Sequence, residues 1–156
     1  LSGRRVAYVG DYNNVARSLA EASLMLGATV GLGCPPGFDA DAVELGRLAE
    51  LGSIEQHAVP GDVVAGADAV HTDTWVSMGQ EGDSDERRRA FEGYTVDHEL
   101  LALAAPHAIF CHCLPAYRGL EVSADVIDGP RSVVVEQGHN RLHSARAALA
   151  LLMGVD

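Results

Sequence analysis

The stretch VAYVGDYNNVARSLAEASLMLG, residues 6–27, contains the pattern that decides the fold. Its first four residues are apolar or aromatic and stop at Gly10, which is typical of a short buried strand. From about Asn13 the apolar residues recur at helical spacing until Gly27. The stretch therefore predicts a strand, a polar turn and a helix.

The same alternation continues along the chain. We expect further strands at 28–32, 54–59, 69–72, 108–113 and 132–135, and further helices at 41–51, 62–67, 86–91, 97–105 and 141–153. In the second helix, Val43, Leu45 and Leu48 are expected to face the core. Because each helix returns the chain to begin a strand in the same direction, the pattern predicts an α/β fold. It is a Rossmann-like three-layer sandwich with a mostly parallel central sheet and helices on both faces.

Composition limits the classes of function. The 156 residues suffice for one domain, and no apolar run approaches the roughly 18 residues of a membrane span. A formal charge of -11 without a basic stripe argues against nucleic acid as a partner. Three cysteines, two of which flank one histidine, argue against a disulfide framework and favour the cytoplasm. We expect a small-molecule role without a membrane partner.

Polar residues follow three of the predicted strands. Asp11, Asn13 and Asn14 follow the first strand, residues 73–78 follow the fourth, and residues 112–115 lie at or after the end of the fifth. In open parallel sheets, ligands bind beyond the carboxyl ends of the strands, near the point where the strand order reverses. We therefore expect the three segments to converge on one edge of the sheet.

The turn after the first strand is unlike a dinucleotide-binding turn. Only Gly10 is present where that fingerprint needs three glycines, so a nicotinamide or flavin site is not expected. Asp11 or Asn13 can serve simply as a helix cap. With one of them capping, the amide of Asn14 can point into the site, where it can donate to a carboxylate and accept from an ammonium group.

Asp73 and Ser77 place a carboxylate and a hydroxyl four residues apart, on either side of the only tryptophan, Trp75. Such a pair suits an α-ammonium group. The segment Thr74–Asp85 has no regular period, which favours a binding loop. In the alternative interpretation, Asp73 forms a turn, Ser77 caps a helix and Met78 fills the core.

The run around His112 ends a predicted strand. Strand alternation places Cys111 and Cys113 on one face and His112 on the other, so we do not expect these three to bind one metal ion or to form a cysteine–histidine nucleophilic pair. Cys111 is expected to be an inert buried thiol. Cys113, at the strand end, is the candidate for a chemical role. Leu114 adds a backbone carbonyl whose direction is constrained by Pro115, and the peptide bond between these two residues can be cis.

Arg141 lies near the expected start of the last helix. A guanidinium and a helix amino terminus together form an anion site that fits phosphate. The alternative is a surface arginine paired with Glu136.

The order and spacing of these motifs resemble the ornithine carbamoyltransferase family over essentially the whole chain. The matching stretches are Gly10-Asp11 with Asn13-Asn14, Asp73-Thr74-Trp75 with Ser77-Met78-Gly79, His112-Cys113-Leu114-Pro115, Asp128-Gly129-Pro130, and Asn140-Arg141 with His143. The resemblance implies that residues 1–156 are the C-terminal, ornithine-binding domain. The N-terminal carbamoyl-phosphate-binding domain, with its Ser-Thr-Arg-Thr loop, is then absent from this sequence.

The resemblance also implies a reaction: transfer of the carbamoyl group from carbamoyl phosphate to the side-chain amine of L-ornithine, giving L-citrulline and phosphate. Neither a metal nor an organic cofactor is expected. The implied protein is a cytoplasmic homotrimer of arginine metabolism, either biosynthetic, as in the urea cycle, or catabolic. Without the missing domain, the fragment is expected to be inactive.

Residue roles carry over from the same resemblance. The implied ornithine-binding residues are Asn14, Asp73, Ser77 and Met78, the last through its backbone. Cys113 lies near the side-chain amine as the expected general base, with Asp73 as the second catalytic residue. The implied carbamoyl-phosphate-binding residues are Cys113, Leu114 through its carbonyl, and Arg141.

One departure from the family pattern leaves alternatives open. Gly138-His139 stands where the family usually has Ala-Glu, so an acid is replaced by a group that is neutral or positive near pH 7. The protein could then be a non-catalytic amino-acid-binding paralogue, or a carbamoyltransferase for another amine such as putrescine or an acylated ornithine. The segment 77–79 argues against another amine. Apolar residues of the last helix, including Leu149 and Leu152, are expected to seek the missing domain.

Overall fold

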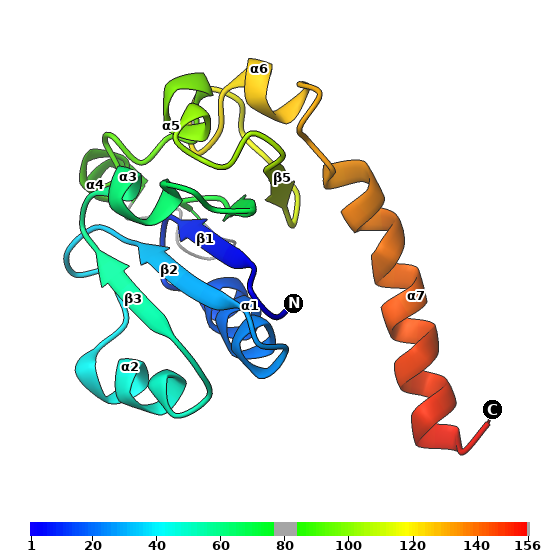
Figure 1. Ribbon diagram of the computed structural model, residues 1–156. Helices are drawn as coiled ribbons and strands as arrows, with labels where there is room; N and C mark the ends of the chain where they lie inside the picture. The colour runs from blue at the N-terminus through cyan, green and yellow to red at the C-terminus, as the bar shows by residue number, and fades with distance from the viewer. Residues whose placement is uncertain (77–83, 156) are drawn as a thin grey trace.

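The computed structural model describes residues 1–76 and 84–155. Within these ranges the first four strands alternate with helices, and two helices precede the last strand and two follow it (Figure 1). The strands are β1 (Arg5–Val9), β2 (Thr29–Gly33), β3 (Ile54–His57), β4 (Ala69–Thr72) and β5 (Ile109–His112). The helices are α1 (Asn14–Met25), α2 (Ala42–Ala49), α3 (Pro60–Val64), α4 (Ser84–Ala90), α5 (His98–Ala102), α6 (Ala124–Ile127) and α7 (Val134–Met153).

The strands form one parallel sheet in the order β3-β2-β1-β4-β5. From β1 at the centre, the chain first builds outward through β2 and β3, and then returns to the other side of β1 to build β4 and β5. The predicted α/β fold with a parallel central sheet is therefore confirmed. The strand order reverses between β1 and β4, which is the position where ligands bind in such sheets.

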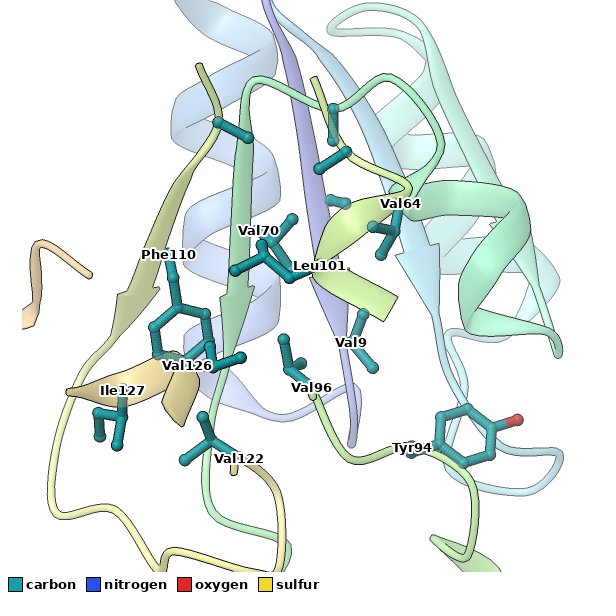
Figure 2. Packing of buried hydrophobic residues seen from close by; sticks show 14 of the residues in the cluster. Val9, Val64, Val70, Tyr94, Val96, Leu101, Phe110, Val122, Val126 and Ile127 are labelled. Carbon is teal, nitrogen blue, oxygen red and sulfur yellow. The ribbon is translucent and has the colours of Figure 1, made fainter. Parts of the chain in front are cut away.

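Helices cover both faces of the sheet. Tyr8 packs with α1 and α2 on one face, whereas its neighbours Ala7 and Val9 pack on the other face, with α3, α5 and α6. Figure 2 shows the second cluster, in which Phe110 of β5 lies near Val126 and Ile127. Because both faces are covered, β1, β2 and β4 are mostly apolar and buried, as is typical of parallel sheets, whereas the edge strand β3 alternates half-buried and exposed residues.

Two glycines of β2 allow α3 to lie directly on the sheet. A Cβ atom at Gly31 would lie 2.8 Å from the Cβ of Val63, and one at Gly33 would lie 2.9 Å from the Cγ2 of Val63. Val63 is fully buried at this contact. Val63 therefore occupies the space that side chains at Gly31 and Gly33 would otherwise take.

Some sequence-based expectations about the fold are wrong. Residues 132–135 do not form a sixth strand: Ser132 makes one isolated bridge with Phe110, and α7 begins at Val134. Val43 does not face the core but is 81% exposed, whereas Leu48 is fully buried. Val43 precedes Leu45 by two residues, which rotates it about 200° around a helix and onto the opposite side.

Helix α7 extends away from the other elements (Figure 1). Val134 is buried and Gln137 is half-buried, but residues 138–149 are exposed. Among them are Leu142 and Leu149, and Leu152 beyond them is 82% exposed, so the expected apolar surface is present. The helix ends at Gly154, which has the left-handed conformation (φ 64°) common after helices.

No helix in the described part of the chain combines the length and the apolar character needed to cross a membrane.

Candidate active site

The three polar segments meet, as expected, at the carboxyl ends of β1, β4 and β5. Together with the first turns of α1 and α7 they line an open cleft of about 750 Å³. The predicted site residues that line it are Asn14, Asp73, Cys113, Leu114 and Arg141. Ser77 and Met78, the other two predicted ligands of ornithine, lie outside the described residues.

Asn13 is the cap of α1, and Asn14 is left exposed at the cleft. The Oδ1 of Asn13 accepts hydrogen bonds from the backbone N–H groups of Val15 (2.9 Å) and Ala16 (3.1 Å). Its Nδ2 donates to the Oδ2 of Asp73 over 2.8 Å. One side chain therefore begins the helix and also ties the segment after β1 to the segment after β4.

Asp73 is a buried carboxylate, 7% exposed, that accepts three hydrogen bonds. Besides the bond from Asn13, its Oδ1 accepts from the backbone N–H of Thr74 (2.8 Å) and from the thiol of Cys113 (2.9 Å). A carboxylate offers about four lone-pair positions. Counting donors from the described residues alone, one position remains for a donor from a substrate.

Cys113 is a hydrogen-bond donor at this site. Burial raises the pKa of its thiol to about 12, and Asp73 adds to the shift through the hydrogen bond and its charge. The positive charge of Arg141 acts weakly in the opposite direction on this pKa. The sulfur consequently keeps its proton near pH 7, and the acceptor in the pair is Asp73.

Leu114 has a backbone conformation that is rare for a residue with a side chain. Its φ is 58°, and its peptide bond to Pro115 is cis. The N–H of Leu114 donates to the Nδ1 of His112 over 2.9 Å, so the chain folds back on the residue that ends β5. Leu114 is 44% exposed and lines the cleft.

His112 and Glu121 form a fully buried pair beneath this turn. The Nε2 of His112 lies 3.2 Å from the Oε1 of Glu121, and both side chains have no solvent exposure. Glu121 was not expected to belong to the site. Its distance of nine residues from His112, across an irregular loop, has no helical or strand period that could have indicated the contact.

The donor atoms of Asp73, His112 and Cys113 all lie within 4.8 Å of one another. Cys111 is not part of this group. Strand alternation placed Cys113 on the face opposite His112 and so did not predict this group. The reason is that β5 ends at His112 and Cys113 lies beyond the regular strand. Both ring nitrogens of His112 are engaged in hydrogen bonds, to Leu114 and Glu121. The expectation that the site works without a metal stays a prediction.

Arg141 does not lie at a helix amino terminus, so that part of the predicted anion site is wrong. Helix α7 begins at Val134, and Arg141 follows about two turns later. The error has the same origin as the false sixth strand, because Val133-Val134-Val135 is a β-prone run that the tertiary structure places at a helix start. The exposed guanidinium still lines the cleft.

Gln137 and His71 are two cleft residues that the sequence did not indicate. The Oε1 of Gln137 accepts from the backbone N–H of His112 (3.0 Å), and its Nε2 lies 3.1 Å from the Nε2 of His71. Burial, with a smaller effect of His112, lowers the pKa of His71 to about 4. Through these contacts Gln137 links the first turn of α7 to the ends of β4 and β5.

Arg87 of α4 joins the segments that follow β1 and β4. Its guanidinium pairs with Asp11, and its Nε donates to the carbonyl of Trp75 over 2.6 Å. The same group lies 4.8 Å from the centre of the Phe38 ring, a favourable cation–π distance. In the sequence Arg87 is only one member of a basic run, and nothing there marks it as buried.

Known proteins resemble this chain in sequence and in fold. The family model for the aspartate/ornithine carbamoyltransferase Asp/Orn-binding domain matches residues 2–152. An ornithine carbamoyltransferase of Acidothermus cellulolyticus is 48% identical over 158 residues, which cover 98% of this chain and 51% of that protein.

Among solved structures, the ornithine carbamoyltransferase from Pyrococcus furiosus is similar with a TM-score of 0.91 and 47% identity, covering 98% of this chain and 50% of that one. An N-acetyl-L-ornithine transcarbamylase has a TM-score of 0.82 and 26% identity, covering 97% of this chain and 50% of that one. The chain thus spans about half the length of the relatives it matches.

Proposed function

This chain belongs to the aspartate/ornithine carbamoyltransferase family, and from that premise we propose that it is the ornithine-binding domain of an ornithine carbamoyltransferase. The complete protein would convert L-ornithine and carbamoyl phosphate into L-citrulline and phosphate. The observation that carries the proposal is the hydrogen-bonded pair of Asp73 and Cys113, in a cleft that Asn14, Leu114 and Arg141 also line.

Ornithine binding follows from the polar groups at the ends of β1 and β4. The amide of Asn14 donates to the α-carboxylate, and the remaining lone-pair position of Asp73 accepts from an ammonium or amine group. Ser77 and the backbone of Met78 complete this set in the proposal. Because the described residues already donate to most of the hydrogen-bonding positions of this buried carboxylate, it selects a single donor from a cationic group of the substrate.

Proton transfer is the chemical step that Asp73 and Cys113 serve. The side-chain amine of ornithine is neutral when its nitrogen attacks the carbonyl carbon of carbamoyl phosphate, and the bond from that carbon to the phosphate oxygen then breaks. The surplus proton of the amine passes to the sulfur of Cys113 as the thiol gives its own proton to Asp73. Cys113 is thus a relay, and Asp73 is the base that holds the proton.

Carbamoyl phosphate is held from the opposite side of the cleft. The carbonyl of Leu114 accepts from the carbamoyl NH₂ group, and Arg141 partners the negative charge of the phosphate and of the oxygen that develops charge during attack. The rest of this subsite belongs to a carbamoyl-phosphate-binding domain outside residues 1–156. The exposed apolar residues of α7 pack against that domain in our proposal.

The wider assignments rest on the family. We propose that the complete protein is a cytoplasmic homotrimer of arginine metabolism that uses no metal or organic cofactor. The chain alone has little or no turnover, because it supplies only one side of the subsite for carbamoyl phosphate.

The test is citrulline formation by the complete protein, assayed with ornithine, putrescine and N-acetylornithine as competing acceptors. We expect turnover with ornithine, and a loss of about 100-fold or more in kcat for Asp73→Asn and Cys113→Ala. Val43→Ala, on the exposed side of α2 and outside the cleft, serves as the control and leaves kcat unchanged. A clear preference for N-acetylornithine or putrescine would disprove the ornithine acceptor. Binding of ornithine by calorimetry without any citrulline would indicate the non-catalytic paralogue.

A further inference from the structure

Glu121 joins the two ends of the turn that carries Cys113 and Leu114. Its Oε1 accepts a hydrogen bond from the backbone N–H of Tyr117 over 2.6 Å and also lies 3.2 Å from the Nε2 of His112. Both ends of the segment 112–117 therefore meet at one oxygen atom. Glu121 is 0% exposed, so this oxygen does not exchange its partners for water.

The hydrogen bonds define the tautomer of His112. The N–H of Leu114 donates to Nδ1, and a ring nitrogen that accepts a hydrogen bond carries no proton. The single ring proton of a neutral imidazole is then on Nε2, which faces Glu121. Glu121 is accordingly the acceptor that selects this tautomer and leaves Nδ1 free to receive Leu114.

This tautomer matters because of the backbone of Leu114. A φ of 58° is unfavourable for a residue with a Cβ atom, so a local interaction has to stabilise it. The bond from the Leu114 N–H to His112 is such an interaction. It also determines the direction of the two peptide groups on either side of Leu114, and hence where the Cys113 sulfur and the Leu114 carbonyl stand in the cleft.

We propose that Glu121 is a positioning residue for the transfer reaction, acting through His112 on the Cys113–Leu114 turn without touching either substrate. This inference rests on the proposed carbamoyl transfer. It predicts that loss of the acceptor oxygen lowers kcat and leaves the KM for ornithine nearly unchanged. Asp73 keeps its hydrogen bonds from Asn13 and Thr74, and Asn14 lies in the first turn of α1 after the Asn13 cap; none of these contacts involves Glu121 or His112.

The experiment compares Glu121→Gln with Glu121→Leu in the complete protein. Glutamine keeps an acceptor oxygen for both His112 and Tyr117, so most of kcat should remain. Leucine removes it, and a displacement of the reacting groups by about 1 Å lowers kcat by about 100-fold. Val122→Ala is the matched control: Val122 is the fully buried neighbour, so its truncation destabilises the fold but leaves kcat per folded molecule unchanged.

Three results would overturn the inference: a kcat for Glu121→Leu close to that of the unmodified protein, equal losses in Glu121→Gln and Glu121→Leu, or an equal loss in Val122→Ala. The histidine ¹⁵N spectrum of the unmodified protein is a second test that needs neither activity nor a folded variant. It should show His112 protonated at Nε2 only, and a proton on Nδ1 would refute the proposal. If the protein makes no citrulline while this tautomer is present, the proposed function fails and the geometry of the turn stands.

Discussion

The Sγ of Cys113 donates a hydrogen bond to the Oδ1 of Asp73 over 2.9 Å, and this contact joins the ends of β4 and β5. On its other oxygen Asp73 accepts from Asn13, which follows β1. One carboxylate therefore links three neighbouring strand ends at the position where the sheet order reverses. Changes at its partners should therefore alter the stability of the fold.

Asn13 can be tested for two functions at once. Asn13→Ala loses the helix cap and the bond to Asp73, so we expect about 1 kcal/mol lower stability, with little dependence on pH. Asn13→Asp keeps the cap but places two carboxylates in contact. Like charges at this distance repel, so its stability should fall as the pH rises from 4 to 8. Urea unfolding at several pH values measures both effects, and a pH-independent Asn13→Asp variant would contradict the predicted contact.

His71 should contribute to acid unfolding. Its pKa is lowered from 6.5 to about 4 in the folded chain, so the unfolded chain binds more protons between these values. The stability that neutral His71 provides is complete above pH 6.5 and is lost as the pH falls toward 4, at up to about 1.4 kcal/mol per pH unit. His71→Gln should flatten this part of the stability curve, whereas the exposed control His143→Gln should not. Equal slopes for both variants would show that His71 does not titrate as expected.

Cys34 should have the opposite effect at alkaline pH. Burial raises the pKa of its thiol from 9.0 to about 12, so above pH 9.0 the unfolded chain loses a proton that the folded chain keeps. Stability should therefore decline from pH 9.0 toward 12 by up to about 1.4 kcal/mol per pH unit. Cys34→Ala should remove this decline when urea midpoints are measured from pH 8 to 11. Cys111→Ala is the comparison and should remove a decline over a narrower range, because its pKa is about 11.

Gly31 should not tolerate a side chain. A Cβ atom there would approach the Cβ of Val63 to 2.8 Å, so Gly31→Ala should destabilise the fold by about 1–3 kcal/mol. Gly46 in α2 is the matched control because a Cβ there meets nothing within 4 Å. Gly46→Ala should stabilise the fold by about 0.5–1 kcal/mol through helix propensity. Thermal unfolding of the two variants would contradict the predicted packing if both moved in the same direction.

The fold was largely predictable because its signals are local. The strands β1, β2 and β4 are mostly buried and appear as largely apolar runs, and residues such as Asn13 and Asp41 mark helix starts through their own side chains. The failure at residues 132–135 is also physical. Three adjacent valines favour a strand by propensity, but Val134 packs into the core from the first turn of α7, and tertiary packing overrides the local preference.

The candidate site was predictable only in part. Asp73 and Cys113 each follow a strand, and because parallel strands end at the same edge of a sheet, their positions in the sequence are enough to bring them together. Glu121, Gln137 and His71 could not be found in this way. The partners of Gln137 and His71 are distant in the sequence, those of Glu121 have no regular spacing, and the contacts depend on how an irregular loop and the first turn of α7 fold back over β5.

The raised pKa values of the thiols have a practical consequence for labelling. The chain has three cysteines, Cys34, Cys111 and Cys113, and all three hold their protons more strongly than a free thiol does. The thiolate is the form of cysteine that reacts with alkylating reagents, so these residues should react slowly at neutral pH. A cysteine introduced on the exposed part of α7, for example at Leu151, would then be modified selectively. A fluorescent probe attached there could report how this helix docks while the native thiols remain untouched.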